Sequence, residues 1–364
     1  MPLIYVRLLM IMYRKQSANV KWNNKLSNEF SLSNGVKQGA VLSAILFCLY
    51  VDDLYKQLMK RRSGCWINEE YYGIIGYSDD MLLVAPSIDA LQEMVSTCEE
   101  YAKEHNLQFS TDANPSKSKT KCMAFTKRKE CELRNILLCS NPLPWVKRIK
   151  HLGSVVTNDL QIMADDTTQK RAEYINKNNE LFQEFHYTHP ASMVKINNYF
   201  NTSFYGSVLW DLFGTESLRL EKTWNISMRK MQHLPRKTHR YVLEPISMTK
   251  HIIFSLYSRF IKFVDGISCC QKSAMRNLLT TIKHDCRSRT GSNLRKIMLL
   301  TNTNHIDEIN SLDIKSLVYF EIPRGDEWRL NMIKELSDYK SGLLKVPGLS
   351  YTELDDMMNH VCST

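Results

Sequence analysis

The stretch that most constrains the fold is YYGIIGYSDDMLLVAPS at residues 71–87. Two adjacent acids, Asp79 and Asp80, separate two short apolar runs, with glycines before them and a proline after the second run. Glycines disfavour a helix ahead of the acids, and proline ends the segment behind them. Short apolar runs bounded by such breakers predict strand, tight turn and strand. The two carboxylates should therefore lie at the tip of a buried hairpin.

A carboxylate pair in that position indicates a cation site. Burying a carboxylate without a partner is costly, so a buried pair is expected to face a positive ion. Oxygen ligands suit Mg²⁺, which one or two carboxylates and substrate phosphates typically hold. The alternative is an exposed turn with two acids at its tip, because Asp is also a common turn residue. The sequence upstream of the pair favours the cation site.

The upstream segment, GVKQGAVLSAILFCLYVDDL at residues 35–54, predicts a glycine-rich loop that enters a long, largely buried helix. Gly35 and Gly39 would let the backbone approach a ligand closely, because glycine has no side chain. Between them, Lys37 supplies a positive charge and Gln38 supplies both a donor and an acceptor. The alternative is an ordinary helix N-terminus with a flexible approach. The apolar positions with helical spacing are Val41, Leu42, Ile45, Leu46, Leu49 and Leu54.

A second Tyr-x-Asp-Asp pattern lies at residues 50–53. Its acids, Asp52 and Asp53, come at the end of the predicted helix, and Leu54 and Leu58 continue the helical stripe beyond them. In a helix the pattern predicts a solvated face or a cap for the next turn, and not a metal site.

Together these stretches resemble the reverse transcriptases of non-LTR (LINE-type) retrotransposons, of the CR1-, L2- and Jockey-like kind. GVKQGAVLS is similar to motif B of the family and GYSDD to its Tyr-x-Asp-Asp motif C, in the family's order and spacing. NPSKSKTKCMAF at residues 114–125 resembles the lysine-bearing motif D. LPWVKRIKHLGSVVT at residues 143–157 resembles the stretch that ends the polymerase palm. YGSVLWDLF and LPRKTHRYVLEP resemble segments that follow the polymerase core, so the resemblance covers nearly the whole chain.

The resemblance implies an α+β fold. A polymerase palm, in which an antiparallel sheet carries packed helices, would be followed by a mostly helical thumb-like region. It also implies an RNA-directed DNA polymerase that extends a primer with dNTPs by two-metal phosphoryl transfer. The cofactor would be Mg²⁺, with Mn²⁺ as a substitute, and the partners would be an RNA template, a DNA primer and dNTPs.

The catalytic and metal-binding residues carried over from motif C are Asp79, as the direct ligand, and Asp80. Ser43 follows from motif B as part of the pocket wall. The nucleotide-binding positions implied by the motifs are Gly35, Lys37, Gln38, Gly39, Tyr77 and Lys121.

Leu152 and Gly153 carry over as part of the primer grip, where the backbone would touch the strand. Lys117, Lys119 and Lys121 belong to the motif D stretch. They would lie near the triphosphate or the template; the alternative is an ordinary solvated basic loop.

The family's motif A supplies another catalytic aspartate upstream of motif B. Residues 1–34 contain no aspartate, and Glu29 is their only acid. The fingers and any nuclease domain are missing as well. The chain is therefore expected to be an N-terminally truncated element that is inactive alone. The alternatives are a non-catalytic remnant that binds nucleic acid through its basic face, and a structural host protein.

The net charge is distributed unevenly along the chain. The net charge of +10 and the isoelectric point near 9.0 favour a polyanionic partner. Residues 303–364 carry a net −5, which leaves +15 on the rest. Three parts are predicted: a partial palm at 1–157 (motifs B to E), a helical, basic, thumb-like region at 158–302, and an acidic tail or small subdomain at 303–364.

Other patterns predict the surrounding elements. Residues 1–14 should form a helix of the core, and residues 20–32 a hairpin. Ser87 should cap a helix that runs to about Glu104, residues 121–125 should form a strand, and a strand pair should lie around Trp145 and Val155. The apolar stripes expected on the two later helices are Leu91, Met94, Val95, Cys98, Tyr101 and Ala102, and Leu220, Trp224, Met228 and Met231.

Cysteine usage and the N-terminus bear on the compartment. The ten cysteines form no CxxC pair and no zinc spacing, which predicts reduced thiols in an intracellular protein of the nucleus or cytoplasm, not a secreted one. The apolar start is interrupted by Arg7, lacks a basic leader and is too short to span a bilayer, so no membrane association is expected.

Overall fold

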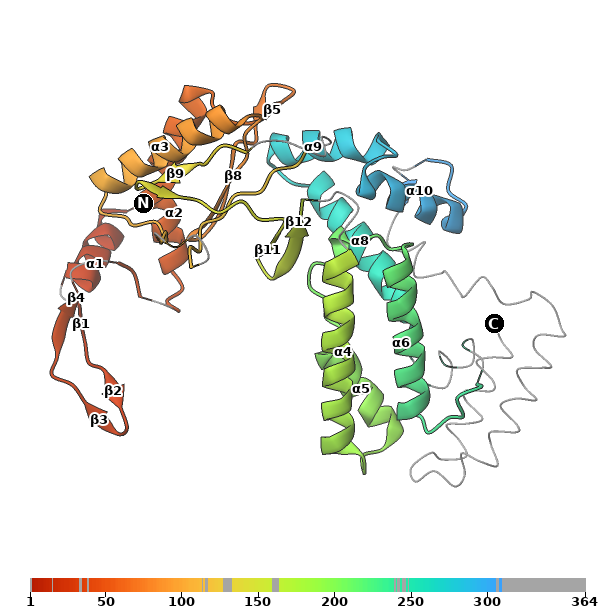
Figure 1. Cartoon of the computed structure of the whole chain (residues 1–364). Helices are drawn as coiled ribbons and strands as arrows, with labels where there is room; N and C mark the ends of the chain where they lie inside the picture. Colours follow the sequence, from red (N-terminus) through yellow and green to blue (C-terminus); the bar gives the residue numbers. More distant parts are fainter. Residues whose placement is uncertain are drawn as a thin grey trace. The chain divides into compact units, whose positions relative to one another are not determined.

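The computed structural model (Figure 1) describes residues 2–14, 16–32, 35–37, 39–112, 114, 117–126, 133–158, 164–238, 240, 243, 247, 249–305 and 308–309. The chain divides into two compact units, the first formed by Met1–Lys117 and Arg134–Pro142 and the second by Ser118–Leu133 and Leu143–Thr364. The described residues form helices and small antiparallel strand pairs up to β12 and helices after it, which confirms the α+β fold class. The predicted boundaries at 157 and 302 remain predictions, and most of the acidic tail lies outside the described residues.

The first unit combines helices with five antiparallel strand pairs among its described residues, namely β1–β4, β2–β3, β5–β6, β7–β8 and β9–β10. Its elements are α1 (Leu3–Arg14), β1 (Gln16–Ala18), β2 (Lys21–Trp22), β3 (Lys25–Leu26), β4 (Phe30–Leu32), α2 (Ser43–Arg61), β5 (Trp66–Ile67), β6 (Glu70–Tyr71), β7 (Ile74–Tyr77), β8 (Asp80–Leu83), α3 (Ile88–Glu104), β9 (Leu137–Leu138) and β10 (Asn141–Pro142).

Helix α3 forms as its sequence predicts. Ser87 caps it by accepting a hydrogen bond from the backbone N–H of Ala90 at 3.2 Å. Its buried stripe includes Met94, Cys98 and Tyr101, which pack with residues of α2 to make the core of this unit. The core places α2 and α3 behind the β7–β8 hairpin.

Two N-terminal helices differ from expectation in their burial. The predicted core helix at the N-terminus forms as α1, but it has no buried residue. Helix α2 is not largely buried either, because only its C-terminal half packs on α3; its N-terminal half leaves Ile45 and Leu49 57% and 67% exposed. Periodicity gives the apolar face of a helix correctly, but it does not say whether a neighbouring element covers that face.

The second unit is mostly helical. Its elements are β11 (Arg148–His151), β12 (Ser154–Thr157), α4 (Ala164–Phe185), α5 (Pro190–Phe200), the short 3₁₀ helix η1 (Ser207–Leu209), α6 (Thr215–Met231), α8 (Ile252–Ser268), α9 (Ser273–His284) and α10 (Arg289–Thr301). Helices α4 and α6 lie side by side (Figure 1).

The core of the second unit confirms the stripe predicted for α6. Leu220, Trp224, Met228 and Met231 are all buried, and they join a cluster that also includes residues of α4, α5, α8, α9 and α10. The strand expected at residues 121–125 is wrong, because that segment forms only an isolated bridge from Cys122 to Trp145. None of the helices in the described part of the chain has both the length and the hydropathy needed to cross a membrane.

Candidate active site

The acid pair lies on a hairpin, as predicted. Strands β7 and β8 pair antiparallel, and Tyr77 lies directly opposite Asp80. Ser78 and Asp79 form the two-residue turn, with a positive φ of 53° at Ser78. A positive φ only at the first turn residue is the type II′ pattern, which matches the twist of a hairpin. Asp79 is therefore a turn residue, and Asp80 begins the second strand.

The inner face of the hairpin packs on the helices. Ile74, Met81 and Leu83 contact the α2–α3 core. Gly76 lies against Tyr55 of α2 so closely that a Cβ at this position would come within 1.8 Å of the tyrosine hydroxyl oxygen. A larger residue at position 76 would force the Tyr55 side chain to move.

The outer face of the hairpin is open, which corrects the expectation of a buried hairpin. Residues directly opposite each other share a face, so Ile75 lies beside Leu82, and Tyr77 beside Asp80. On this face Ile75 is 53% exposed, Leu82 41% and Tyr77 67%, and both acids are exposed as well. The reason is that the hairpin is a two-stranded sheet in the described residues, with helices on one face only.

The two carboxylates offer the oxygen ligands that suit a hard divalent cation, but no third acid joins them in the part of the chain that the structure describes. Within the described residues, no group of three or more His, Cys, Asp or Glu side chains is arranged to hold a metal. Glu29 therefore does not join Asp79 and Asp80; it accepts a hydrogen bond from the hydroxyl of Ser17 instead. The donor set fits one cation held with substrate phosphates, and it does not fit two.

The competing acid pair on α2 is confirmed as a solvated face. Asp52 and Asp53 are exposed, and both form ion pairs with Lys56, at 2.7 Å and 3.1 Å. These hydrogen bonds raise the pKa of the Lys56 ammonium. A lysine one turn away thus offsets part of the charge of the two acids.

The loop that enters α2 lines a small concavity. Gly35 and Gly39 have φ of 93° and 80°, in the region that favours glycine. The Ser43 hydroxyl donates to the carbonyl oxygen of Lys37 at 2.5 Å, which ties the loop to the start of the helix. Gln38 lies outside the described residues.

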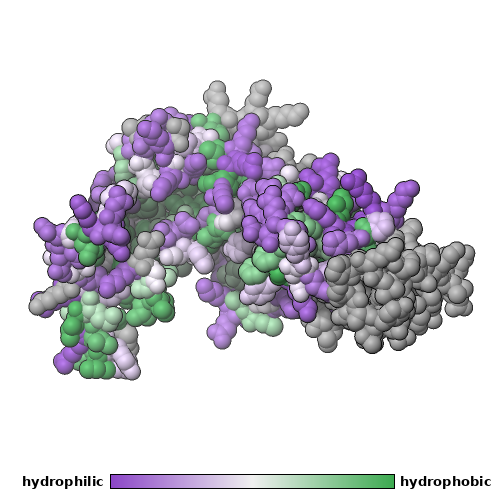
Figure 2. All heavy atoms as spheres, turned by 90° about the horizontal axis from the view of Figure 1, so that it is seen from below, coloured by the Kyte–Doolittle hydropathy of each residue, from purple (hydrophilic) through white to green (hydrophobic). Residues whose placement is uncertain are grey.

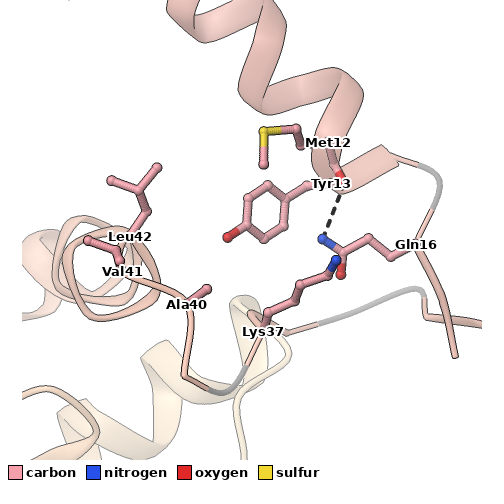
Figure 3. Close-up of a pocket in the computed structure, with 7 residues that line it drawn as sticks. All are labelled: Met12, Tyr13, Gln16, Lys37, Ala40, Val41 and Leu42. Carbon is pink, nitrogen blue, oxygen red and sulfur yellow. Dashed lines mark hydrogen bonds between the residues drawn. The ribbon is translucent and has the colours of Figure 1, made fainter.

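This concavity has a volume of about 230 Å³ (Figure 3). Figure 3 shows the Lys37 side chain extending beside Gln16, with the Tyr13 ring between Lys37 and the pair Val41 and Leu42 just before α2. The lining residues are Met12, Tyr13, Gln16, Lys37, Ala40, Val41 and Leu42. Of the predicted nucleotide-binding residues it contains Lys37, and neither acid of the hairpin is among its lining residues.

The lysines of the motif D stretch are exposed. Lys117 belongs to the first unit, and Lys119 and Lys121 belong to the second. Their exposure is consistent both with a contact to phosphate and with a solvated loop, so their assignment stays a prediction.

The predicted primer-grip turn joins β11 to β12. Leu152 and Gly153 form its two-residue loop with φ of 47° and 80°, so both have positive values, as in a type I′ turn. Leucine is uncommon in this conformation. Gly153 lies against Tyr205, whose ring would be 3.3 Å from an added Cβ. The turn is thus held in a specific backbone conformation beside an aromatic ring.

A buried carboxylate that sequence reasoning missed anchors this turn. Asp166 of α4 is 1% exposed, and it accepts hydrogen bonds from the backbone N–H of Val155 at 3.0 Å and from Nε1 of Trp210 at 2.7 Å. The carboxylate therefore joins the β11–β12 hairpin, α4 and the YGSVLWDLF segment. The signal for it was the Asp165–Asp166 pair at the start of a helix, which looks like an ordinary acidic first turn.

The basic residues on α6 and in the segment after it are partly used within their own unit. Arg219 pairs with Glu216, and Arg240 lies 3.7 Å from Glu221. Lys230 lies 3.8 Å from the centre of the Phe182 ring. Several of the charges that suggested a nucleic-acid surface thus also stabilise the helical unit.

An acid-bearing hairpin packed on two helices in an α+β unit is the arrangement expected of a polymerase palm. Residues 3–156 match the family model described as reverse transcriptase (RNA-dependent DNA polymerase). The match runs from α1 into β12, and it includes every site residue named from the sequence. A domain of this kind implies a nucleic-acid template and primer, and nucleotides as substrates.

Proposed function

We propose that the chain carries the palm of an RNA-directed DNA polymerase of a non-LTR, LINE-type retrotransposon, with Asp79 and Asp80 as its catalytic carboxylates. The observation that carries the proposal is the GYSDD hairpin, with its acids at the turn, within the region that matches the reverse transcriptase model. The motif B loop and the Leu152–Gly153 turn would contribute the nucleotide pocket and the primer grip.

The chemistry is the attack of a primer 3′-hydroxyl on the α-phosphate of a dNTP, with pyrophosphate as the leaving group. Divalent cations, Mg²⁺ or Mn²⁺, supply charge stabilisation at the attacking and leaving oxygens. Asp79 and Asp80 would hold one of them by their exposed carboxylates. Lys37 would offset negative charge on the triphosphate, and Gly35 and Gly39 would let the loop backbone approach it.

The chain alone is proposed not to polymerise. Two cations need acids that converge from separate elements, and a turn residue and its strand neighbour cannot bracket both. Within the described residues no third acid joins the pair. Losing one metal position removes several kcal/mol of transition-state stabilisation, and each 1.36 kcal/mol is about tenfold in rate.

Primer extension tests this in two steps. The 364-residue chain should incorporate dNTPs on an RNA template no faster than its Asp79→Asn variant. A version with the motif A segment of a family member fused ahead of the chain should polymerise, Asp79→Asn should abolish that activity, and Asp53→Asn should change it by less than about threefold. Activity that depends on Asp53 and not on Asp79 would contradict the proposal.

The second candidate is a non-catalytic nucleic-acid-binding protein. The observation that favours it is the missing third acid within the described residues. Failure of the fused version to polymerise, with retained binding of a primer–template duplex, would select this candidate.

A further inference from the structure

The segment between α1 and α2 forms a long two-stranded ribbon. Its base pairs Gln16–Ala18 with Phe30–Leu32, and its outer end pairs Lys21–Trp22 with Lys25–Leu26. Asn23 and Asn24 make the turn at the tip with φ of 46° and 61°, as a type I′ turn requires. In Figure 1 the ribbon extends away from α1, with β2 and β3 at its far end.

The two faces of the outer end carry different side chains. Trp22 lies directly opposite Lys25, so these two share one face, and Lys21 and Leu26 share the other. Trp22 is 75% exposed and Leu26 is 70% exposed. The end of the molecule where α1 and the ribbon lie shows green hydrophobic patches beside purple hydrophilic ones (Figure 2).

Packing within the ribbon does not explain the exposure of the Trp22 indole. The other tryptophan on a small hairpin of this unit, Trp66, is 39% exposed; its ring lies 5.0 Å from the Tyr71 ring and 5.8 Å from the Arg62 guanidinium. In the described part of the chain, no aromatic ring or cation lies against the Trp22 ring as Tyr71 and Arg62 lie against Trp66. Its flat surface is presented to solvent.

The charge around Trp22 favours a polyanion over a protein surface. The ribbon, residues 16–32, contains two lysines and one acid, and that acid, Glu29, lies beside the base strands and accepts a hydrogen bond from Ser17; the chain as a whole carries +10. A lysine beside an exposed aromatic ring, on a chain of net positive charge, is the combination that binds single-stranded nucleic acid.

We propose that Trp22 and Lys25 form a stacking site for single-stranded nucleic acid at the tip of the ribbon. An unpaired base would stack on the indole, and the Lys25 ammonium would contact a neighbouring phosphate. A duplex would not offer an open base face, so the ligand is a single strand. The site goes beyond the proposed polymerase function because it needs neither metal nor dNTP.

Fluorescence anisotropy of a labelled oligo(dT) or oligo(rU), in EDTA and without dNTPs, tests the stacking. Trp22→Ala in the full chain should weaken binding about tenfold, and Trp22→Phe should retain most of the affinity because it keeps an aromatic face. Leu26→Ala is the matched control, since it removes an equally exposed apolar side chain from the opposite face of the same ribbon. It should change the affinity by less than about twofold.

The two lysines provide a second matched pair. Lys25→Gln should reduce the magnitude of the log–log salt slope by about 0.7, and Lys21→Gln should change it less. Equal effects of Trp22→Ala and Leu26→Ala would overturn the proposal. So would a Trp22→Ala variant that binds the oligonucleotide normally but shifts the sedimentation of the chain, because the ring would then serve a protein contact. Because polymerisation is not measured, failure of the proposed activity would leave this result intact.

Discussion

The buried carboxylate of Asp166 gives the sharpest prediction about stability. Asp166→Ala removes the acceptor of two buried donors, the backbone N–H of Val155 and the indole N–H of Trp210. Hydrogen bonds to a charged group contribute roughly 1.5–3 kcal/mol each, and a buried donor left without a partner carries its desolvation penalty. The alanine variant no longer buries a negative charge, and this recovers part of the lost free energy. The free energy of unfolding of the second unit should fall by about 3–4 kcal/mol.

The adjacent residue provides the control. The Asp165 side chain is 42% exposed and lies 3.6 Å from Arg148, so Asp165→Ala should cost less than about 1 kcal/mol. Urea unfolding followed by far-UV circular dichroism measures both, because the second unit holds most of the helix. If Asp166→Ala and Asp165→Ala shift the unfolding transition by the same amount, the anchoring role of Asp166 is wrong.

Three further outcomes are expected. Burial, aided by Arg240, holds the pKa of His251 at about 3 although the Glu221 carboxylate lies 3.8 Å away. The unfolded chain binds that proton below about pH 6.5, so stability is lost as the pH falls from 6.5 towards 3, and His251→Gln should flatten this part of a urea-midpoint profile. Leu152→Asn should raise the free energy of unfolding by about 0.5 kcal/mol, because asparagine tolerates the positive φ at this position. Gly153→Ala should lower the free energy of unfolding, because alanine does not tolerate the positive φ there. A lower urea midpoint for Leu152→Asn than for Gly153→Ala would contradict the observed turn. Binding of RNA and DNA should show little sequence preference and fall steeply with salt, with a log–log slope of roughly −0.7 to −0.9 per neutralised phosphate; salt-insensitive binding would contradict the electrostatic interpretation.

The local elements could be predicted from the sequence because their signals are local. Glycines and a proline around Asp79 and Asp80 specified the hairpin, and Ser87 specified the start of α3. The stripe on α6 at spacings of three and four residues identified the core face of the second unit. Each of these features depends on a residue and its neighbours within about two helical turns.

The burial of the elements could not be predicted in the same way. The apolar spacing of α1 and α2 indicated core helices, yet α1 has no buried residue, and Ile45 and Leu49 in the first half of α2 are exposed. Whether an apolar face is covered depends on elements distant in sequence. Asp166 was missed for the same reason, since its partners Val155 and Trp210 are 11 and 44 residues away and no local pattern connects them.

The central claim is that the hairpin acids, and not the look-alike pair on α2, form the metal site. Tb³⁺ can replace Mg²⁺ at oxygen ligands and emits when a nearby tyrosine is excited, and Tyr77 lies directly opposite Asp80 on the same face of the hairpin. Tyrosine-sensitised Tb³⁺ emission should therefore appear, be displaced by excess Mg²⁺, and vanish in the variant with both Asp79→Asn and Asp80→Asn. The matched variant with Asp52→Asn and Asp53→Asn should keep the emission. Emission that is lost with the second pair and kept with the first would contradict the assignment of the site.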